Sequence, residues 1–130
     1  MNNLQSFSTT LGEVVNLFQG LAINAKTRHL LSPKGLPLLR IKDLIDGTSE
    51  QFIDSQKAPY KSIVNEDDIV FTRTGQVGLA FRGRRGVLHN NSFKVIPDET
   101  VISKEFLYWF LRQKSIYNYV NQIASGSVQK

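Results

Sequence analysis

The hydrophobic positions of this chain form short runs over its first hundred residues and a helical repeat after them. The short runs are apolar or β-branched and are bounded by glycine, proline, asparagine or aspartate, which predicts β-strands. They lie at 11–18, 36–41, 69–72, 77–81, 87–89 and 92–96. The polar stretches 24–35 and 48–62 are predicted to be loops, with Pro59 as a breaker in the second.

From Ser103 the apolar spacing changes to three and four residues, which predicts a helix with one apolar face. The positions on that face are Phe106, Trp109, Phe110, Gln113, Ile116, Tyr117, Val120 and Ile123. Ser103 is the expected N-cap, Gly126 the expected end, and a break is expected near Lys114. The aromatic side chains of this face are expected to point inward as core, or to form an interface.

Strands followed by helices predict a mixed α/β fold of the α+β kind. We expect a small, twisted, mainly antiparallel sheet of short strands with a C-terminal helical segment. The length of 130 residues fits one domain, predicted at 11–130 after a flexible N-terminus at 1–10. No apolar run is long enough to span a membrane and no secretory signal is present, so a cytoplasmic location is expected.

Candidate catalytic and metal-binding groups are sparse. The chain has no cysteine, which excludes disulfides, thiol catalysis and cysteine-built zinc sites. Neither of the common glycine-rich phosphate-binding patterns occurs, and His29 and His89 lie far apart without matching ligands. The acids Glu66, Asp67 and Asp68 are adjacent in a predicted turn, which favours a solvated turn over acid–base catalysis. We therefore expect no enzymatic activity, no metal and no cofactor.

Positive charge is concentrated in the middle of the chain. The formal net charge is +5, and the segment 69–95 contains Arg73, Arg82, Arg84, Arg85 and Lys94 without an acid. Because charge placed for solubility is normally mixed in sign, this segment favours binding to a polyanion such as nucleic acid.

Three clusters contain side-chain types that suit DNA recognition. They are Arg40 with Lys42, the segment 72–76, and the segment 82–92. Arginine can form two hydrogen bonds with guanine, and asparagine or glutamine can do so with adenine, whereas threonine, serine and glycine amides suit phosphate contacts. The candidate DNA-contacting residues are Arg73, Thr74, Gln76, Arg82, Arg84, Arg85, Asn90, Asn91, Arg40 and Lys42.

Each cluster also has a structural explanation, which stays open from the sequence. The segment 73–76 could be a polar hairpin loop, and 83–86 could be a solvated turn. Asn90 and Asn91 could form a turn with positive φ, and Arg40 and Lys42 could protect an edge strand from pairing.

The ordered motifs resemble a target recognition domain of the specificity subunit of Type I restriction-modification systems. The resemblance covers about residues 11–130, and its most specific parts are Asp-Ile-x-x-Thr-Arg-Thr-Gly-x-x-Gly at 68–78 and Ala-Ser-Gly-Ser-x-Gln-Lys at 124–130. The other matching stretches are 11–13, 36–44 with Gly47, 91–97 and 105–111. One departure is Asp67, where the family usually has glycine before the Asp-Ile strand.

The resemblance implies a part in a larger assembly. Such a subunit has two recognition domains joined by helical spacers, and each domain reads half of a split target in double-stranded DNA. Methylation and cleavage belong to separate methyltransferase and restriction subunits. By resemblance, the segment 72–78 is a loop region near DNA. By this resemblance, we expect this chain to correspond to one such domain, with a spacer helix expected to begin near Lys130. We then expect either an excised domain or a natural half-subunit that would need a second copy of itself.

Other functions remain open at this point. The chain could be the recognition domain of a fused restriction-methylation enzyme. It could also be a protein–protein docking module that uses its C-terminal helix, or a binder of single strands or RNA without sequence preference.

Overall fold

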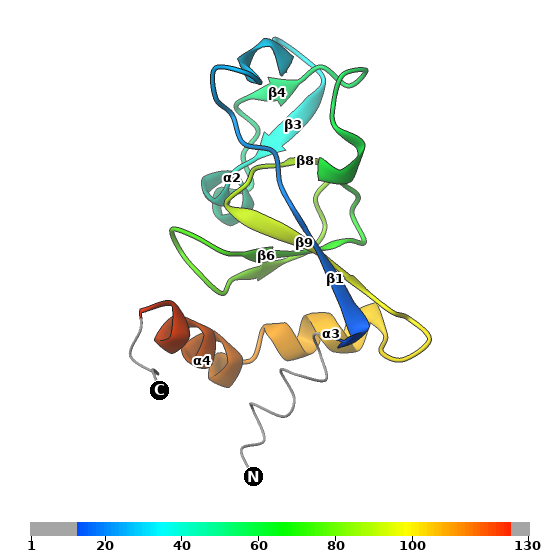
Figure 1. The fold of residues 1–130 in the computed structure, drawn as a ribbon, viewed down its shortest axis with the longest axis vertical. Coiled ribbons are helices and arrows are strands. Elements are labelled where there is room, and N and C mark those ends of the chain that lie inside the picture. Colours follow the sequence, from blue (N-terminus) through cyan, green and yellow to red (C-terminus); the bar gives the residue numbers. More distant parts are fainter. Residues whose placement is uncertain (1–12, 126–130) are drawn as a thin grey trace.

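Two β-sheets and a pair of C-terminal helices build the part of the chain that the structure describes, residues 13–125 of a computed structural model (Figure 1). The strands are β1 (Val15–Gln19), β2 (Leu31–Ser32), β3 (Leu36–Leu39), β4 (Phe52–Ile53), β5 (Ile63–Val64), β6 (Ile69–Thr72), β7 (Ala80–Phe81), β8 (Gly86–Leu88) and β9 (Ser92–Pro97). The helices are α2 (Ile41–Asp46), α3 (Lys104–Leu111) and α4 (Lys114–Ala124), with 3₁₀ turns η1 (Arg28–Leu30) and η2 (Tyr60–Ser62).

The two sheets stack along the long axis of the molecule. A four-stranded sheet has the order β1-β9-β6-β7 and is antiparallel throughout. A five-stranded sheet has the order β2-β4-β3-β8-β5, in which only β3 and β8 run parallel. Helices α3 and α4 lie beyond the four-stranded sheet, at the end opposite β3 and β4 (Figure 1). The predicted mixed α/β class with mainly antiparallel strands is confirmed.

Strand β6 shows why this arrangement is stable. Successive side chains of a strand point to opposite faces of its sheet. Ile69 packs into the core beneath α3 and α4, together with Val95, Leu107, Leu111 and Ile116. Val70 points to the other face and joins the core that links the two sheets. Both residues are almost fully buried, so β6 has apolar side chains on both faces.

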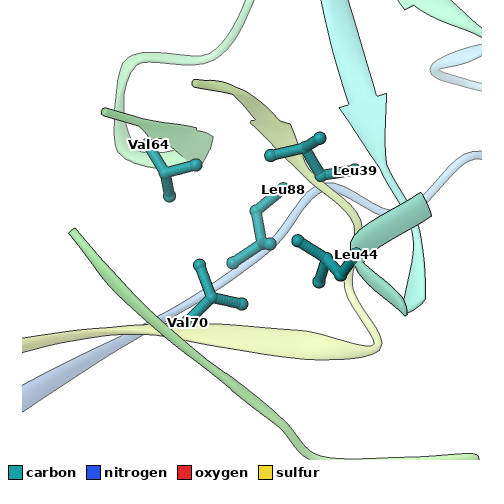
Figure 2. Close-up of a cluster of buried hydrophobic side chains, with 5 residues drawn as sticks. All are labelled: Leu39, Leu44, Val64, Val70 and Leu88. Carbon is teal, nitrogen blue, oxygen red and sulfur yellow. The ribbon is translucent and has the colours of Figure 1, made fainter. Parts of the chain in front are cut away.

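The core between the sheets is assembled from five separate elements. Figure 2 shows Leu39 of β3, Leu44 of α2, Val64 of β5, Val70 of β6 and Leu88 of β8 converging on one another. A third core of Leu30, Leu38, Ile53 and Val87 lies on the far side of the five-stranded sheet. Each fully buried Leu, Ile or Val contributes about 1.5–3 kcal/mol through removal of apolar surface from water.

Several details differ from the sequence predictions. The strands form two sheets instead of one, because β4 within the predicted loop 48–62 pairs with β3, and β5 directly after that loop pairs with β8. The expected strand 36–41 ends at Leu39, and the unexpected helix α2 begins at Ile41. Of the expected strand 77–81, only Ala80–Phe81 pairs. Residues 1–10 and Gly126 lie outside the described residues.

The C-terminal helix was predicted correctly in place, and its buried face was predicted in part, since Phe110, Ile116 and Val120 pack in the core. The break falls at Arg112 and Gln113, between α3 and α4, and Ser103 accepts a hydrogen bond from the Phe106 backbone N–H as an N-cap (3.1 Å). In α3 the buried side chains are Leu107 and Leu111, which share a face of their own four residues apart. The inward orientation predicted for Phe106 and Trp109 is wrong, since these side chains are 47% and 57% exposed.

Tyr117 and Ile123 of α4, also placed on the inward face, are 40% and 50% exposed. Both helices carry apolar side chains on more than one face, and the sheet covers only one face of each. None of the helices within residues 13–125 is both long and apolar enough to cross a membrane.

Candidate nucleic-acid interface

The loop between β6 and β7, residues 73–79, is closed by a single buried threonine. Thr72 is 1% exposed, and its hydroxyl donates a hydrogen bond to the Gln76 carbonyl and accepts one from the Leu79 N–H at 2.9 Å. Its backbone completes the closure, since the Thr72 carbonyl accepts from the Gly78 N–H (3.1 Å). The loop is therefore held at its base without help from the side chains at its tip.

Helix α4 fixes the far side of this loop. The Asn121 side-chain amide donates to the Val77 carbonyl at 2.9 Å. Gly78 has φ +88°, and a Cβ placed there would lie 3.1 Å from Nδ2 of Asn121. The positive φ favours glycine at this position, and any larger residue would also press on the Asn121 side chain. At the tip, a Cβ on Gly75 would lie 3.6 Å from the Ile41 side chain, so the loop reaches the start of α2.

The turn between β8 and β9, residues 89–91, is joined to the same loop. The Asn91 carbonyl accepts from the backbone N–H groups of Arg73 (2.8 Å) and Thr74 (3.3 Å). The Arg73 guanidinium donates to the Asn90 carbonyl at 2.9 Å and lies 5.7 Å from the centre of the Phe93 ring. The two connections therefore form one unit, which lies on the same side of the molecule as α2 (Figure 1).

We call this unit the amide edge and define it by Arg73, Thr74, Gln76, Asn90 and Asn91. Within residues 13–125, the side chains of Thr74, Gln76, Asn90 and Asn91 form no hydrogen bond. Thr74 and Gln76 are exposed, and the two asparagines are partly exposed. No non-glycine residue of the described chain has positive φ, so the asparagines do not serve a left-handed turn. Their donors and acceptors are available to a ligand.

Arg40 and Lys42 are neutralised by neighbouring carboxylates. Arg40 donates to both oxygens of Asp43 (2.7 and 3.0 Å) and to Glu50 (2.8 Å). Lys42 forms an exposed ion pair with the same Glu50 at 2.8 Å. Two cations thus face two carboxylates and the group has no net charge. The Asp43 carboxylate also closes the first turn of α2, because it accepts a hydrogen bond from the Arg40 backbone N–H (3.2 Å).

Asp43 is the fully buried centre of that group. Burial alone would raise the pKa of its carboxyl, but hydrogen bonds from Arg40 and from the Thr48 hydroxyl (2.6 Å) outweigh burial. The pKa of Asp43 is consequently lowered to about 2. The carboxylate stays charged at neutral pH and holds α2 and the following residues together.

Arg82, Arg84 and Arg85, which we call the arginine turn, bond to distant parts of the chain. Arg84 donates to the carbonyls of Asp43 (3.0 Å) and Thr48 (2.8 Å) at the end of α2. Arg82 donates to the Asp67 carbonyl at 2.8 Å and lies 3.4 Å from Glu105. Arg85 donates to the Asn65 side chain. These three arginines, predicted as DNA contacts, thus use part of their hydrogen-bond donors on acceptors within the chain.

His89 lies at the margin of the amide edge. Its Nδ1 atom is buried without a hydrogen-bond partner. Burial, and to a smaller extent the nearby Arg40 charge, lower the pKa of its imidazole. Among residues 13–125 no group of three or more His, Asp or Glu side chains is arranged to hold a metal ion.

Sequence reasoning missed the residues that support the edge. Asp43 could have been found from its position three residues after Arg40, a spacing typical of a helix-capping pair followed here by Gly47 in the left-handed conformation (φ 72°). Asn121 gives no such signal, because its contact with Val77 spans 44 positions in the sequence.

Residues 6–130 match the Type I restriction modification DNA specificity domain family. A crystal structure of the HsdS subunit from Thermoanaerobacter tengcongensis superposes on this fold with a TM-score of 0.60 and 17% sequence identity, over 82% of this chain and 30% of that one. The comparison with curated proteins finds no match.

A second solved structure, from work on complex assembly and conformational transition of the type I R-M system, gives a TM-score of 0.59 at 18% identity. It covers 78% of this chain and 25% of that one. The chain thus spans less than a third of the length of the solved structures that it resembles. The protein is a DNA specificity domain by class. It belongs to the Type I restriction modification DNA specificity domain family, as the resemblance implied.

Proposed function

We propose that this chain recognises double-stranded DNA by sequence, reading one half-site of a split target, and has no catalytic activity itself. Family membership supports the general role. The observation that carries the proposal is the amide edge. Its loops are held by backbone groups, Thr72 and Asn121, which leaves the side chains of Thr74, Gln76, Asn90 and Asn91 unbonded.

The chemistry of the amide edge fits base recognition in the major groove. The N–H group of an asparagine or glutamine amide can donate to adenine N7, while the amide oxygen accepts from the adenine N6 amino group. Each such pair contributes about 1–3 kcal/mol of discrimination. Arg73 lies between the two loops, where a cation can pair with guanine or phosphate. We assign Gln76, Asn90 and Asn91 to bases, and Arg73 and Thr74 to bases or phosphates.

The remaining predicted contacts take a different role in this proposal. Arg40, Lys42, Arg82, Arg84 and Arg85 hold α2 and the sheet connections in place. They would affect DNA binding through the position of the amide edge rather than by direct contact. The partners are the methyltransferase and restriction subunits of the complex, together with a second copy of the chain if it is a natural half-subunit.

The proposal is tested by selecting bound duplexes from a random library with the chain and with Gln76→Ala, Asn90→Ala and Asn91→Ala. We expect the chain to enrich a short motif, and each variant to lose preference at one or two positions by about 5- to 150-fold. Asn118→Ala is the matched control, since it removes an exposed amide of α4 that lies outside the amide edge. A library that stays random with the unaltered chain would refute sequence recognition by this chain.

Binding of a single domain should be weak and dependent on salt. We expect a Kd of about 10⁻⁴–10⁻⁶ M for unselected duplexes at physiological salt. If single strands competed better than duplexes, the chain would instead be a single-strand binder.

A further inference from the structure

Most unpaired cations among residues 13–125 lie around β2 and β4, in segments where the sequence predicted no DNA contact. Lys26, Arg28, Lys34 and Lys57 surround the outer edge of the five-stranded sheet, and we call them the distal basic end. All four are exposed. Within residues 13–125 their charged groups form no hydrogen bond or ion pair. Residues 22–35 contain no acid, and Asp54 is the sole acid of 54–58.

These four residues form one surface because their segments pack on one core. The Leu30 carbonyl accepts from the Asp54 N–H (3.0 Å), and the Asp54 carbonyl accepts from the Lys57 N–H (3.0 Å). Lys34 lies in the turn between β2 and β3 and borders the same 54–56 turn. Leu30, Leu31, Ile53 and Ala58 belong to the core beneath.

Acidic residues gather at the opposite end. Asp67 and Asp68 pair with Lys104, and Glu105 pairs with Arg82, beside α3. Glu66, Asp98 and Glu99 add exposed carboxylates to the same region. A duplex held at the amide edge would be repelled from this acidic end and attracted to the distal basic end.

Strand β3 connects the amide edge with the distal basic end. It runs from Leu36, two residues after Lys34, to Leu39, whose carbonyl accepts a hydrogen bond from the His89 N–H (3.1 Å) beside Asn90 of the amide edge. Arg40 follows Leu39 directly. A strand rises about 3.3 Å per residue, so the six steps from Lys34 to Arg40 span roughly 20 Å. Because base pairs repeat every ~3.4 Å, that span equals about six base pairs.

We propose that the distal basic end binds the phosphate backbone of the duplex about half a helical turn from the recognised bases. This inference rests on the proposed function. It adds a second anchor that carries no sequence information and sets the direction in which DNA leaves the amide edge. Its four cations supply contacts that the internally paired arginine turn does not.

The absence of cysteine allows a direct test by site-specific crosslinking. Lys34→Cys, Gln76→Cys and Glu99→Cys are each labelled with a photoreactive group and irradiated with a duplex selected by the chain. We expect crosslinks from positions 34 and 76, displaced from each other by about six base pairs, and none from the acidic end at position 99.

The outcomes separate the two proposals. Crosslinking at 76 without crosslinking at 34 overturns the distal contact and leaves the proposed function intact. Loss of crosslinking at 76 contradicts the proposed function itself. Crosslinks of equal yield at 34 and 99 overturn the inference, because contact would then be unspecific.

Salt dependence gives an independent measurement. Each phosphate contact removed should reduce the slope of log K against log salt by about 0.9. Lys34→Gln should do so, and adding Lys26→Gln, Arg28→Gln and Lys57→Gln should reduce the slope stepwise. Lys61→Gln is the control, an exposed lysine that lies beside Phe18 outside the distal basic end. Equal effects of Lys34→Gln and Lys61→Gln would overturn the inference.

Discussion

The amide edge and the arginine turn are built from similar polar sequences but use their side chains in opposite ways. At the amide edge, backbone groups and the buried Thr72 close the loops, and the side chains of Thr74, Gln76, Asn90 and Asn91 form no hydrogen bond within residues 13–125. The Arg73 side chain, by contrast, donates to a carbonyl of the edge. At the arginine turn, the guanidinium groups themselves bond to α2 and to the 65–68 turn. We infer that side chains at a loop tip stay available for a ligand where backbone groups or a buried residue hold the loop.

This difference predicts that the internal network around Asp43 is the most sensitive part of the polar structure. Asp43→Ala removes a buried acceptor from Arg40 and Thr48 and should lower the free energy of unfolding by about 2–4 kcal/mol. Urea unfolding followed by circular dichroism measures this loss. Asp46→Ala on the same helix is the control, because Asp46 is exposed and should change stability by less than about 0.5 kcal/mol. Equal effects of the two substitutions would show that the network is dispensable.

The same carboxylate should make stability fall in acid. The folded-state pKa of Asp43, about 2, lies below the usual value of about 3.9 in an unfolded chain. Its contribution is therefore complete above about pH 5 and disappears as the pH falls through the folded pKa, a total of about 2 kcal/mol. Roughly half should be lost at pH 3.

We expect the loss of stability between pH 7 and pH 3 to be about 1 kcal/mol smaller in Asp43→Asn than in the unaltered chain. Comparing the two chains removes the contribution of the other acids. If both lost the same amount of stability, Asp43 would not be stabilised as a charged group.

The local structure around the amide edge could be predicted from the sequence, whereas the hydrogen-bond partners of the arginine turn could not. The 73–79 loop and the 89–91 turn flank the paired strands β6 and β9, which the β-branched and turn residues defined. The sequence predicted these strands but not their pairing order, and the pairing of β6 with β9 brings the loop and the turn together. The partners of Arg84 lie 36 and 41 positions away, on a helix that the sequence did not predict. Counting acids within 69–95 therefore could not predict which uncharged acceptors hold the Arg84 guanidinium.

Substitution of Thr72 tests whether its hydroxyl, and not the side chains at the loop tip, holds the amide edge in place. Thr72→Val keeps the shape of the side chain but leaves the Leu79 N–H without its acceptor, and should cost about 1–3 kcal/mol of stability. It should also weaken DNA binding, whereas Gln76→Ala should weaken binding without changing stability. Thr72→Ser, which retains the hydroxyl, is the control. A fully stable Thr72→Val that still binds DNA would show that the hydroxyl does not hold the loop.

Alanine substitution of one glycine in each region is expected to give the smallest difference in stability between the amide edge and the arginine turn. Gly78 of the amide-edge loop and Gly83 beside the arginines both have positive φ, +88° and +103°. Only Gly78 is crowded, since a Cβ there would meet Asn121 at 3.1 Å, whereas nothing lies within 4 Å of a Cβ on Gly83. We expect Gly83→Ala to cost about 1 kcal/mol from backbone strain alone.

Gly78→Ala should cost about 1 kcal/mol more, because it adds contact with α4 to the same backbone strain. It should also displace the loop and reduce DNA binding, which Gly83→Ala should leave unchanged. Urea unfolding and binding titrations of both variants measure the contrast. Combining Gly78→Ala with Asn121→Ala should remove the crowding but also the bond to Val77, so that stability stays low while the two losses are less than additive. Strictly additive losses would mean that α4 does not press against the loop.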